Sequence, residues 1–235
     1  DIYKDRKAGQ IYEGPLVVLT SPYSASASEI FAGAIQDYDR GVIVGSPTTH
    51  GKGSVQTVIG LDQYLMGIVP DMEPDTAGML KLTTALFYRV NGASTQGRGI
   101  EADVIVPTPY VFHEYEKDLD DALAWDEIPA ASFKSSGNLD GIIPQLATRS
   151  ASRVDTNEVL QRFDDRAAKW LAEKDENKPI SLNLETRKAE REKLMRDLGI
   201  EDEDEDEETP PDGEDSDPEE TVSKPDDVLQ EALMV

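Results

Sequence analysis

Three serines, Ser24, Ser26 and Ser28, stand two residues apart just before a stretch with helical periodicity. Serines in this position most often cap the helix, and taken alone the run favours capping. A serine at a helix N-terminus can also act as a nucleophile, because the free N–H groups and the positive end of the helix stabilise an oxyanion. That chemistry requires a base to take the hydroxyl proton.

Two residues about 25 positions further along could be that base. Lys52 lies between Gly51 and Gly53, whose lack of side chains allows a tight turn and the close approach of another segment. A lysine can accept a proton only when it is neutral, which removal from water favours; otherwise it is an ordinary solvated or phosphate-facing lysine. His50 is the alternative base, but the sequence has no G-x-S-x-G elbow to accompany it.

The elements that would position these residues can be predicted from the hydrophobic pattern. The β-branched run Pro15–Leu19 predicts a buried strand, and Gly41–Gly45 predicts a second. Between them, a helix that opens at Ser28-Glu29 has its apolar residues on one face: Ile30, Phe31, Ala34, Ile35 and Tyr38. If the segment after Gly51 is extended, Lys52, Ser54 and Gln56 point to the same side.

These residues resemble a known family. The segments S-A-S-A-S-E-I-F-A-G-A-I-Q-D-Y, V-G-x-P-T and G-K-G-x-V-Q are similar to those of the carboxy-terminal processing proteases, most of all the tail-specific branch. The resemblance implies a catalytic Ser26, with Lys52 as its base and Gln56 completing the site. It also implies that the backbone N–H of Ala27 is one oxyanion donor.

The chain departs from the family pattern in three places. Thr49-His50 stands where the family usually has a single aromatic residue, and Ser46 replaces a glutamate that often precedes the proline. The family's PDZ domain and the glycine-rich segment with its second oxyanion donor belong upstream and are not in this sequence. We therefore expect this fragment alone to be incomplete as an enzyme.

The resemblance continues to about residue 108, through a tyrosine-arginine strand, an N-G-x-S-T-Q turn and a G-I-x-x-D-V strand. The pattern predicts strands at Thr57–Gly60, Met79–Val90 and Asp103–Pro107, with a turn at Asn91-Gly92. Strands alternating with helix indicate an α/β (α+β) fold, a sheet with backing helices.

The second half of the chain is predicted to be mainly helical. The spacing predicts a helix over His113–Trp125 and helices from Ile142 to Arg196, interrupted by an extended piece at Pro179–Leu184. This order resembles the C-terminal region of tail-specific proteases; coiled-coil or partner-binding helices are the alternative. The predicted domains are 1–110, the C-terminal part of a serine protease core; 111–200, a helical C-terminal domain; 201–224, an acidic disordered linker; and 225–235, a short docking helix.

Composition excludes several functions. The formal net charge of −25 argues against binding to nucleic acid or an anionic membrane surface. No cysteine is present for a disulfide or thiolate metal site, and no apolar run approaches the 18 residues of a membrane span. His113 is interpreted as a surface or capping residue rather than a metal ligand, and we expect neither a metal nor another cofactor.

Two functions remain compatible with the sequence. The first, which the resemblance implies, is a serine endopeptidase that recognises proteins through their C-termini in the periplasm of a Gram-negative cell. An adaptor protein and the face of the inner membrane are further contacts that the resemblance allows. The second is an inactive peptide-binding or scaffold protein of the same fold, which the intact Ser26, Lys52 and Gln56 argue against.

Overall fold

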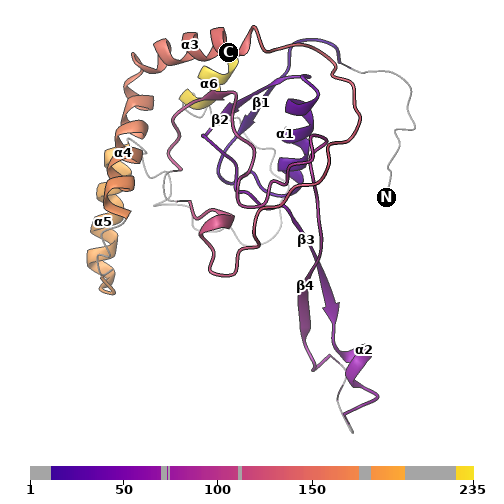
Figure 1. Ribbon diagram of the computed structural model, residues 1–235. Helices are drawn as coiled ribbons and strands as arrows, with labels where there is room; N and C mark the ends of the chain where they lie inside the picture. Colours follow the sequence, from indigo (N-terminus) through magenta and orange to yellow (C-terminus); the bar gives the residue numbers. More distant parts are fainter. Residues whose placement is uncertain (1–11, 70–72, 74, 111–112, 175–180, 199–225) are drawn as a thin grey trace, which may run out of the picture.

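The computed structural model describes residues 12–69, 73, 75–110, 113–174, 181–198 and 226–235. It has a mixed α/β fold, as predicted (Figure 1). Its elements in chain order are β1 (Val17–Thr20), α1 (Ala27–Asp37), β2 (Val42–Gly45), β3 (Ser54–Gly60), α2 (Asp62–Leu65), β4 (Met79–Leu86), β5 (Val104–Ile105), the 3₁₀ turn η1 (Glu116–Asp118), α3 (Ile143–Val154), α4 (Glu158–Lys174), α5 (Leu184–Leu198) and α6 (Asp227–Met234).

A small parallel sheet forms the centre of the molecule. Its strand order is β1-β2-β5, and α1 makes the crossover from β1 to β2. Because side chains alternate along a strand, Ile43 of β2 packs with Ala32 of α1 on one face of the sheet. Val42 and Val44 pack on the other face, against residues of α3, α4 and α6. The sheet is therefore covered by helices on both faces, which suits its nearly continuous apolar strands.

Helix α1 buries a different face from the one that its large apolar residues suggest. Its buried residues are Glu29, Ala32 and Gly33. In the described structure, the side chains of Ile30 and Phe31 are about half exposed. Small residues on the buried face let the helix approach the sheet closely, with the side chain of Ile100 against Gly33.

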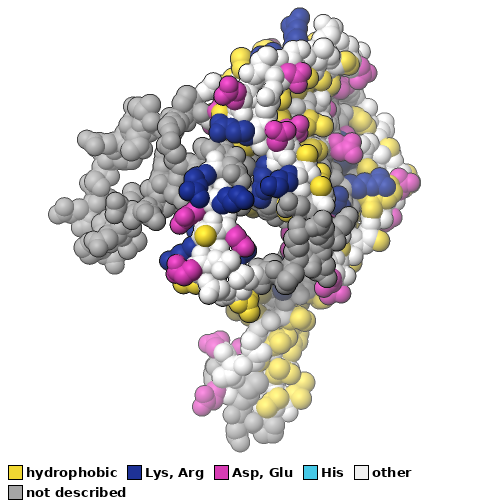
Figure 2. Space-filling model, turned by 90° about the vertical axis from the view of Figure 1, so that its left-hand side faces the viewer, with side chains coloured by type: hydrophobic (Ala, Val, Ile, Leu, Met, Phe, Trp, Pro, Cys, Tyr) yellow, Lys and Arg dark blue, Asp and Glu magenta, His cyan; other side chains and the backbone are white. Residues whose placement is uncertain are grey.

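Strands β3 and β4 form a two-stranded antiparallel ribbon that projects from the body as an arm (Figure 1). Its register shifts between Val55 and Gln56. Most of the ribbon is exposed, and hydrophobic side chains line one side of the arm in Figure 2. The sequence predicted both strands but not the short helix α2 near the end of the arm.

The helix predicted over His113–Trp125 is wrong. The structure has only the 3₁₀ turn η1 within that range, and residues 111–112 lie outside the described part of the chain. Tertiary contacts replace the helix: the indole N–H of Trp125 donates to Ser94 O at 3.0 Å, and the guanidinium of Arg98 stacks on the Trp125 ring. The long separation of these partners explains why local spacing did not reveal them.

The helices predicted from Ile142 onward are confirmed as α3, α4 and α5, which form the face toward the viewer in Figure 2 with many of the visible Lys and Arg side chains. The predicted extended piece lies mostly outside the described residues, and α5 already begins at Leu184. The acidic linker also lies outside them. No helix in the described part of the chain is long and apolar enough to cross a membrane.

The last residues form helix α6, which packs against the body. Asp226 caps it by accepting hydrogen bonds from the N–H groups of Val228 and Leu229. Ala232 is buried in the core beside β2 and α4. The carboxylate of Glu231 is also buried and accepts bidentate hydrogen bonds from the guanidinium of Arg153 in α3. The core therefore joins the 1–110 segment to the helices that follow it, while the predicted division into domains stays a prediction.

Candidate active site

Ser26 occupies the sharp turn that joins β1 to α1. It is the residue just before the helix and has φ 55° and ψ −108°. A residue other than glycine in this region costs about 1–3 kcal/mol, and such residues concentrate at functional sites. The surrounding hydrogen bonds hold the turn in place: Ser26 O accepts from the N–H groups of Glu29 and Ile30, both at 3.0 Å. Of the three serines in the run, only Ser26 has a positive φ.

The first N–H of the helix is free to receive an oxyanion. Among the described residues, no group accepts a hydrogen bond from the N–H of Ala27, whereas the N–H of Ser26 donates to Glu29 Oε2 at 2.7 Å. The positive end of the helix adds to the attraction for negative charge at this point. This geometry suits the role that the sequence resemblance implies for Ala27.

Lys52 and Gln56 lie on the same side of the extended segment, as strand alternation predicts. The Nζ of Lys52 donates to Gln56 Oε1 at 3.2 Å and to Ser54 O at 3.4 Å. Within the described part of the chain it makes no hydrogen bond to Ser26. Lys52 and Gln56 are thus in direct contact. Ser26 is connected to Lys52 through a third residue.

That residue is Glu29, whose side chain is fully buried. Its Oε2 accepts hydrogen bonds from the backbone N–H groups of Ser26 at 2.7 Å and Lys52 at 2.9 Å. Its Oε1 accepts from the N–H of Gly51 at 2.7 Å and the hydroxyl of Thr49 at 2.6 Å. Because Ser26 and Lys52 donate to the same oxygen, their backbone nitrogens are neighbours. Charge-assisted hydrogen bonds of this kind are about twice as strong as neutral ones.

His50 is turned toward a second histidine rather than toward Ser26. Its Nδ1 lies 2.9 Å from Nε2 of His113, and its Nε2 lies 3.4 Å from Glu116 Oε2. Burial and the neighbouring His50 lower the pKa of His113 below its ordinary value. Both ring nitrogens of His50 are therefore engaged by residues other than Ser26. The described residues also include no cluster of three or more His, Cys, Asp or Glu that could hold a metal ion.

The loop around Lys52 is also held from the other side. Gln96 is fully buried, and its Oε1 accepts a hydrogen bond from the N–H of Gly53 at 3.0 Å. The N–H of Gly97 donates to Gly51 O at 2.7 Å. Gly53 must be a glycine here, since a Cβ would lie 2.7 Å from the backbone nitrogen of Gln96.

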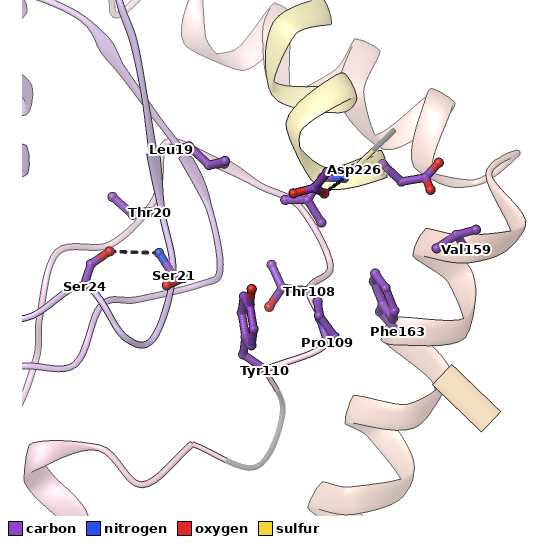
Figure 3. Close-up of a pocket in the computed structure, with 12 residues that line it drawn as sticks. Leu19, Thr20, Ser21, Ser24, Thr108, Pro109, Tyr110, Val159, Phe163 and Asp226 are labelled. Carbon is purple, nitrogen blue, oxygen red and sulfur yellow. Dashed lines mark hydrogen bonds between the residues drawn. The ribbon is translucent and has the colours of Figure 1, made fainter. Parts of the chain in front are cut away.

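A cavity of about 550 Å³ opens beside the serine turn. Figure 3 shows Ser21 and Ser24 on one wall, Tyr110 in the middle and Phe163 of α4 on the far side, with Asp226 at the start of α6. Its lining is mixed: hydroxyl and carboxylate residues share the wall with the apolar side chains of Leu19, Val159 and Phe163. Ser24 lines this cavity and belongs to the turn that carries Ser26, whereas Ser26 itself does not line it.

The linking roles of Glu29 and Gln96 were not predicted from the sequence. A local signal did exist for Glu29, because Ser26-x-x-Glu29 has the S-x-x-E spacing in which the glutamate reaches back to the first backbone N–H. That signal predicts the contact with Ser26 but not the contacts with Thr49, Gly51 and Lys52. For Gln96 the sequence offers only its place in the N-G-x-S-T-Q turn.

Comparison with known proteins accounts for nearly the whole chain. Residues 1–106 match the model of peptidase family S41, and residues 115–235 match the model of the C-terminal domain of tail specific protease. A tail-specific protease from Haemophilus influenzae is 40% identical over 196 residues, which are 82% of this chain and 27% of that protein. A carboxy-terminal-processing protease from Bartonella bacilliformis is 45% identical over 106 residues, 45% of this chain and 21% of that protein.

Among solved structures, the photosystem II D1 C-terminal processing protease is 34% identical over 42% of this chain and 22% of its own, with a TM-score of 0.32. This chain spans about a quarter of the length of the curated relatives it matches.

Proposed function

Because the chain belongs to the tail-specific proteases of peptidase family S41, we propose that it carries the Ser-Lys site of a serine endopeptidase. Ser26 is the nucleophile, Lys52 is the general base, and Gln56 orients Lys52. The observation that carries the proposal is the buried carboxylate of Glu29, which binds the backbone of Ser26 and the backbone of Lys52 at one oxygen. A fold that needed only a helix cap at this point would not require the second contact.

The reaction has two stages. In the first, Ser26 Oγ attacks the scissile carbonyl carbon while neutral Lys52 takes the hydroxyl proton, and the N–H of Ala27 stabilises the resulting oxyanion. The tetrahedral intermediate then collapses, the C–N bond breaks, and Lys52 gives its proton to the leaving amine. In the second stage water attacks the ester on Ser26 while Lys52 takes a proton from the water. The bond between the acyl carbon and Ser26 Oγ then breaks, Lys52 returns the proton to Oγ, and the carboxylic acid is released.

Lys52 must move during this cycle. Its Nζ is bound by Gln56 and Ser54 O in the structure, so activation requires Nζ to turn toward Ser26 Oγ until the two are within hydrogen-bond reach. Gln56 Oε1 is a neutral acceptor that can keep one N–H of the amine oriented throughout. Lys52 is half-buried, so a bound polypeptide would exclude further water from it.

The substrate that we propose is a polypeptide recognised through its C-terminus, as the names of the relatives suggest. The cavity beside Ser24 would receive a part of the polypeptide near the cleaved bond, with an apolar side chain against Tyr110 and Phe163. A periplasmic location and an adaptor protein belong to the same proposal and follow from the family resemblance.

The test is peptide hydrolysis by a full-length protein that contains this chain. Ser26→Ala should abolish turnover and leave the fold intact, since it removes only one hydroxyl. Ser24→Ala and Ser28→Ala are matched controls that should retain turnover. Neither residue caps α1: Ser28 is exposed within the first turn of the helix, and Ser24 Oγ accepts from the N–H of Ser21, a bond whose loss costs about 1 kcal/mol. Near-normal turnover by Ser26→Ala, with loss in either control, would refute the assignment. A parent protein that hydrolyses no peptide would instead favour the inactive scaffold.

A further inference from the structure

Glu116 lies at the centre of a hydrogen-bond network beside the lysine loop. Its Oε1 accepts from Gln96 Nε2 at 3.0 Å, its Oε2 lies 3.4 Å from His50 Nε2, and its backbone N–H donates to His50 O at 3.1 Å. Its side chain is only 13% exposed. Glu116 belongs to η1, within the residues that match the C-terminal domain rather than the peptidase model.

The contact with Gln96 fixes which way the Gln96 amide points. An amide has one accepting oxygen and one donating nitrogen, and turning it over exchanges them. The ionised carboxylate of Glu116 can only accept, so it holds Nε2 on its own side and leaves Oε1 to accept from the N–H of Gly53. In the opposite orientation two donors would meet at Gly53, and two acceptors at Glu116.

This orientation matters for Lys52 because three consecutive N–H groups hold the loop. Those of Gly51 and Lys52 bind Glu29, and that of Gly53 binds Gln96. Lys52 is therefore fixed at its backbone from two sides, one belonging to α1 and the other to the 94–99 loop. If the Gln96 contact is lost, the loop keeps its bonds to Glu29 and the bond from the N–H of Gly97 to Gly51 O. The N–H of Gly53, next to Lys52, then loses its acceptor, and the lysine side chain has a less defined starting point.

We propose that Glu116 is a positioning residue for Lys52, acting through Gln96 and the N–H of Gly53, so that the C-terminal domain supplies part of the support of the active site. This inference rests on the proposed peptidase function for its effect on rate. The connection through hydrogen bonds does not depend on it and can be measured separately.

A charge exchange tests the proposal. Gln96→Glu places two carboxylates in contact, which keep their bonds only while they share one proton. We expect kcat to fall by about tenfold to a hundredfold at pH 8 to 9 with KM within about twofold, and to fall less at pH 6. Adding Glu116→Gln exchanges the two groups, so that the carboxylate is at position 96 and the amide donor is at position 116. The value of kcat should then return to within about threefold of the parent, and the extra pH dependence should vanish.

The matched control is Glu114→Gln in the Gln96→Glu background. Glu114 is exposed in the same segment, and removing its charge supplies no donor to residue 96, so it should not restore kcat. If Gln96→Glu fails to fold, Gln96→Met, which removes both hydrogen bonds without adding charge, should show the same fall in kcat. The proposal would be overturned if Glu114→Gln restored kcat in the Gln96→Glu background as well as Glu116→Gln does. It would also be overturned if Gln96→Glu and Gln96→Met left kcat unchanged.

Hydrogen exchange of the Gly53 amide, read by NMR in the same variants, gives a second readout. Exchange should be at least about tenfold faster in Gln96→Glu at pH 8 and should slow again in the exchanged pair. If the parent hydrolyses no peptide, the proposed function fails, and the Gly53 amide still decides whether Glu116 positions the loop. An equal exchange rate in all variants would contradict it.

Discussion

Replacing Glu29 by glutamine is the most informative single substitution in the described part of the chain. The shape of the side chain is kept, but one of its two accepting oxygens becomes a donating NH₂ group. The four groups that now donate to Glu29 are three backbone N–H groups and the hydroxyl of Thr49. Since one oxygen of the carboxylate serves two of them, glutamine must leave two donors without their acceptor.

The less costly orientation places the NH₂ group toward Thr49 and Gly51. The hydroxyl of Thr49 already accepts from the N–H of Ile100 at 2.8 Å and can accept once more, but the N–H of Gly51 is left facing a donor. Leaving one buried N–H unsatisfied costs about 1–3 kcal/mol, and the remaining bonds lose their charge assistance. Part of this loss is offset because the neutral glutamine no longer requires a charge to be buried. We expect the free energy of unfolding to fall by about 2–3 kcal/mol, which a typical domain survives folded.

Activity should fall further than stability requires. A loss of about 1.4 kcal/mol in the alignment of Ser26 with Lys52 is a tenfold loss in kcat, so we expect at least about tenfold at a temperature where the variant is folded. The assay is hydrolysis of one peptide at several concentrations, paired with denaturant unfolding. The exposed Glu127→Gln is the matched control and should change neither quantity. Wild-type kcat and stability in Glu29→Gln would refute the linking role of the carboxylate.

Three further predictions follow from the structure. Because the pKa of His113 is lowered in the folded chain, its contribution to stability is present above about pH 6.5 and is lost as the pH falls through the folded pKa. In a plot of unfolding free energy against pH, His113→Asn should reduce the slope over that range. Arg153→Met should cost about 3 kcal/mol in unfolding free energy because it leaves the buried Glu231 unpaired, whereas Glu231→Gln should cost less since Arg153 is 31% exposed and can reach water. Tyr110→Ala should raise KM several-fold with little change in kcat, because Tyr110 lines the cavity and not the turn; an unchanged KM would remove the cavity from the substrate path.

The sequence predicted the elements whose signals are local. The apolar runs that became β1 and β2 are β-branched and bounded by turn residues, and the helices from Ile142 onward have clear periodicity. Alternation along the extended segment correctly placed Lys52 and Gln56 on one side, because that relation depends only on neighbouring residues.

The remaining features depend on contacts between distant residues. Glu29 reaches Lys52 across 23 positions, and Gln96 reaches Gly53 across 43. The segment with Glu116 was predicted to be an α-helix from its spacing, yet Glu116 begins only a 3₁₀ turn, and its backbone N–H donates to the distant His50 O. Without the fold, a buried carboxylate that joins two loops cannot be distinguished from an acid in the first turn of a helix.

The central claim is that Lys52 accepts the proton of Ser26, and a pH–rate profile of Lys52→Arg in the full-length protein tests it most directly. Arginine keeps the positive charge and the length of the side chain but cannot give up its proton. The parent should become faster with rising pH as Lys52 loses its proton, and Lys52→Arg should be inactive at every pH at which it is folded. Turnover by Lys52→Arg, together with its loss in His50→Ala, would contradict the Ser-Lys mechanism and make His50 the base.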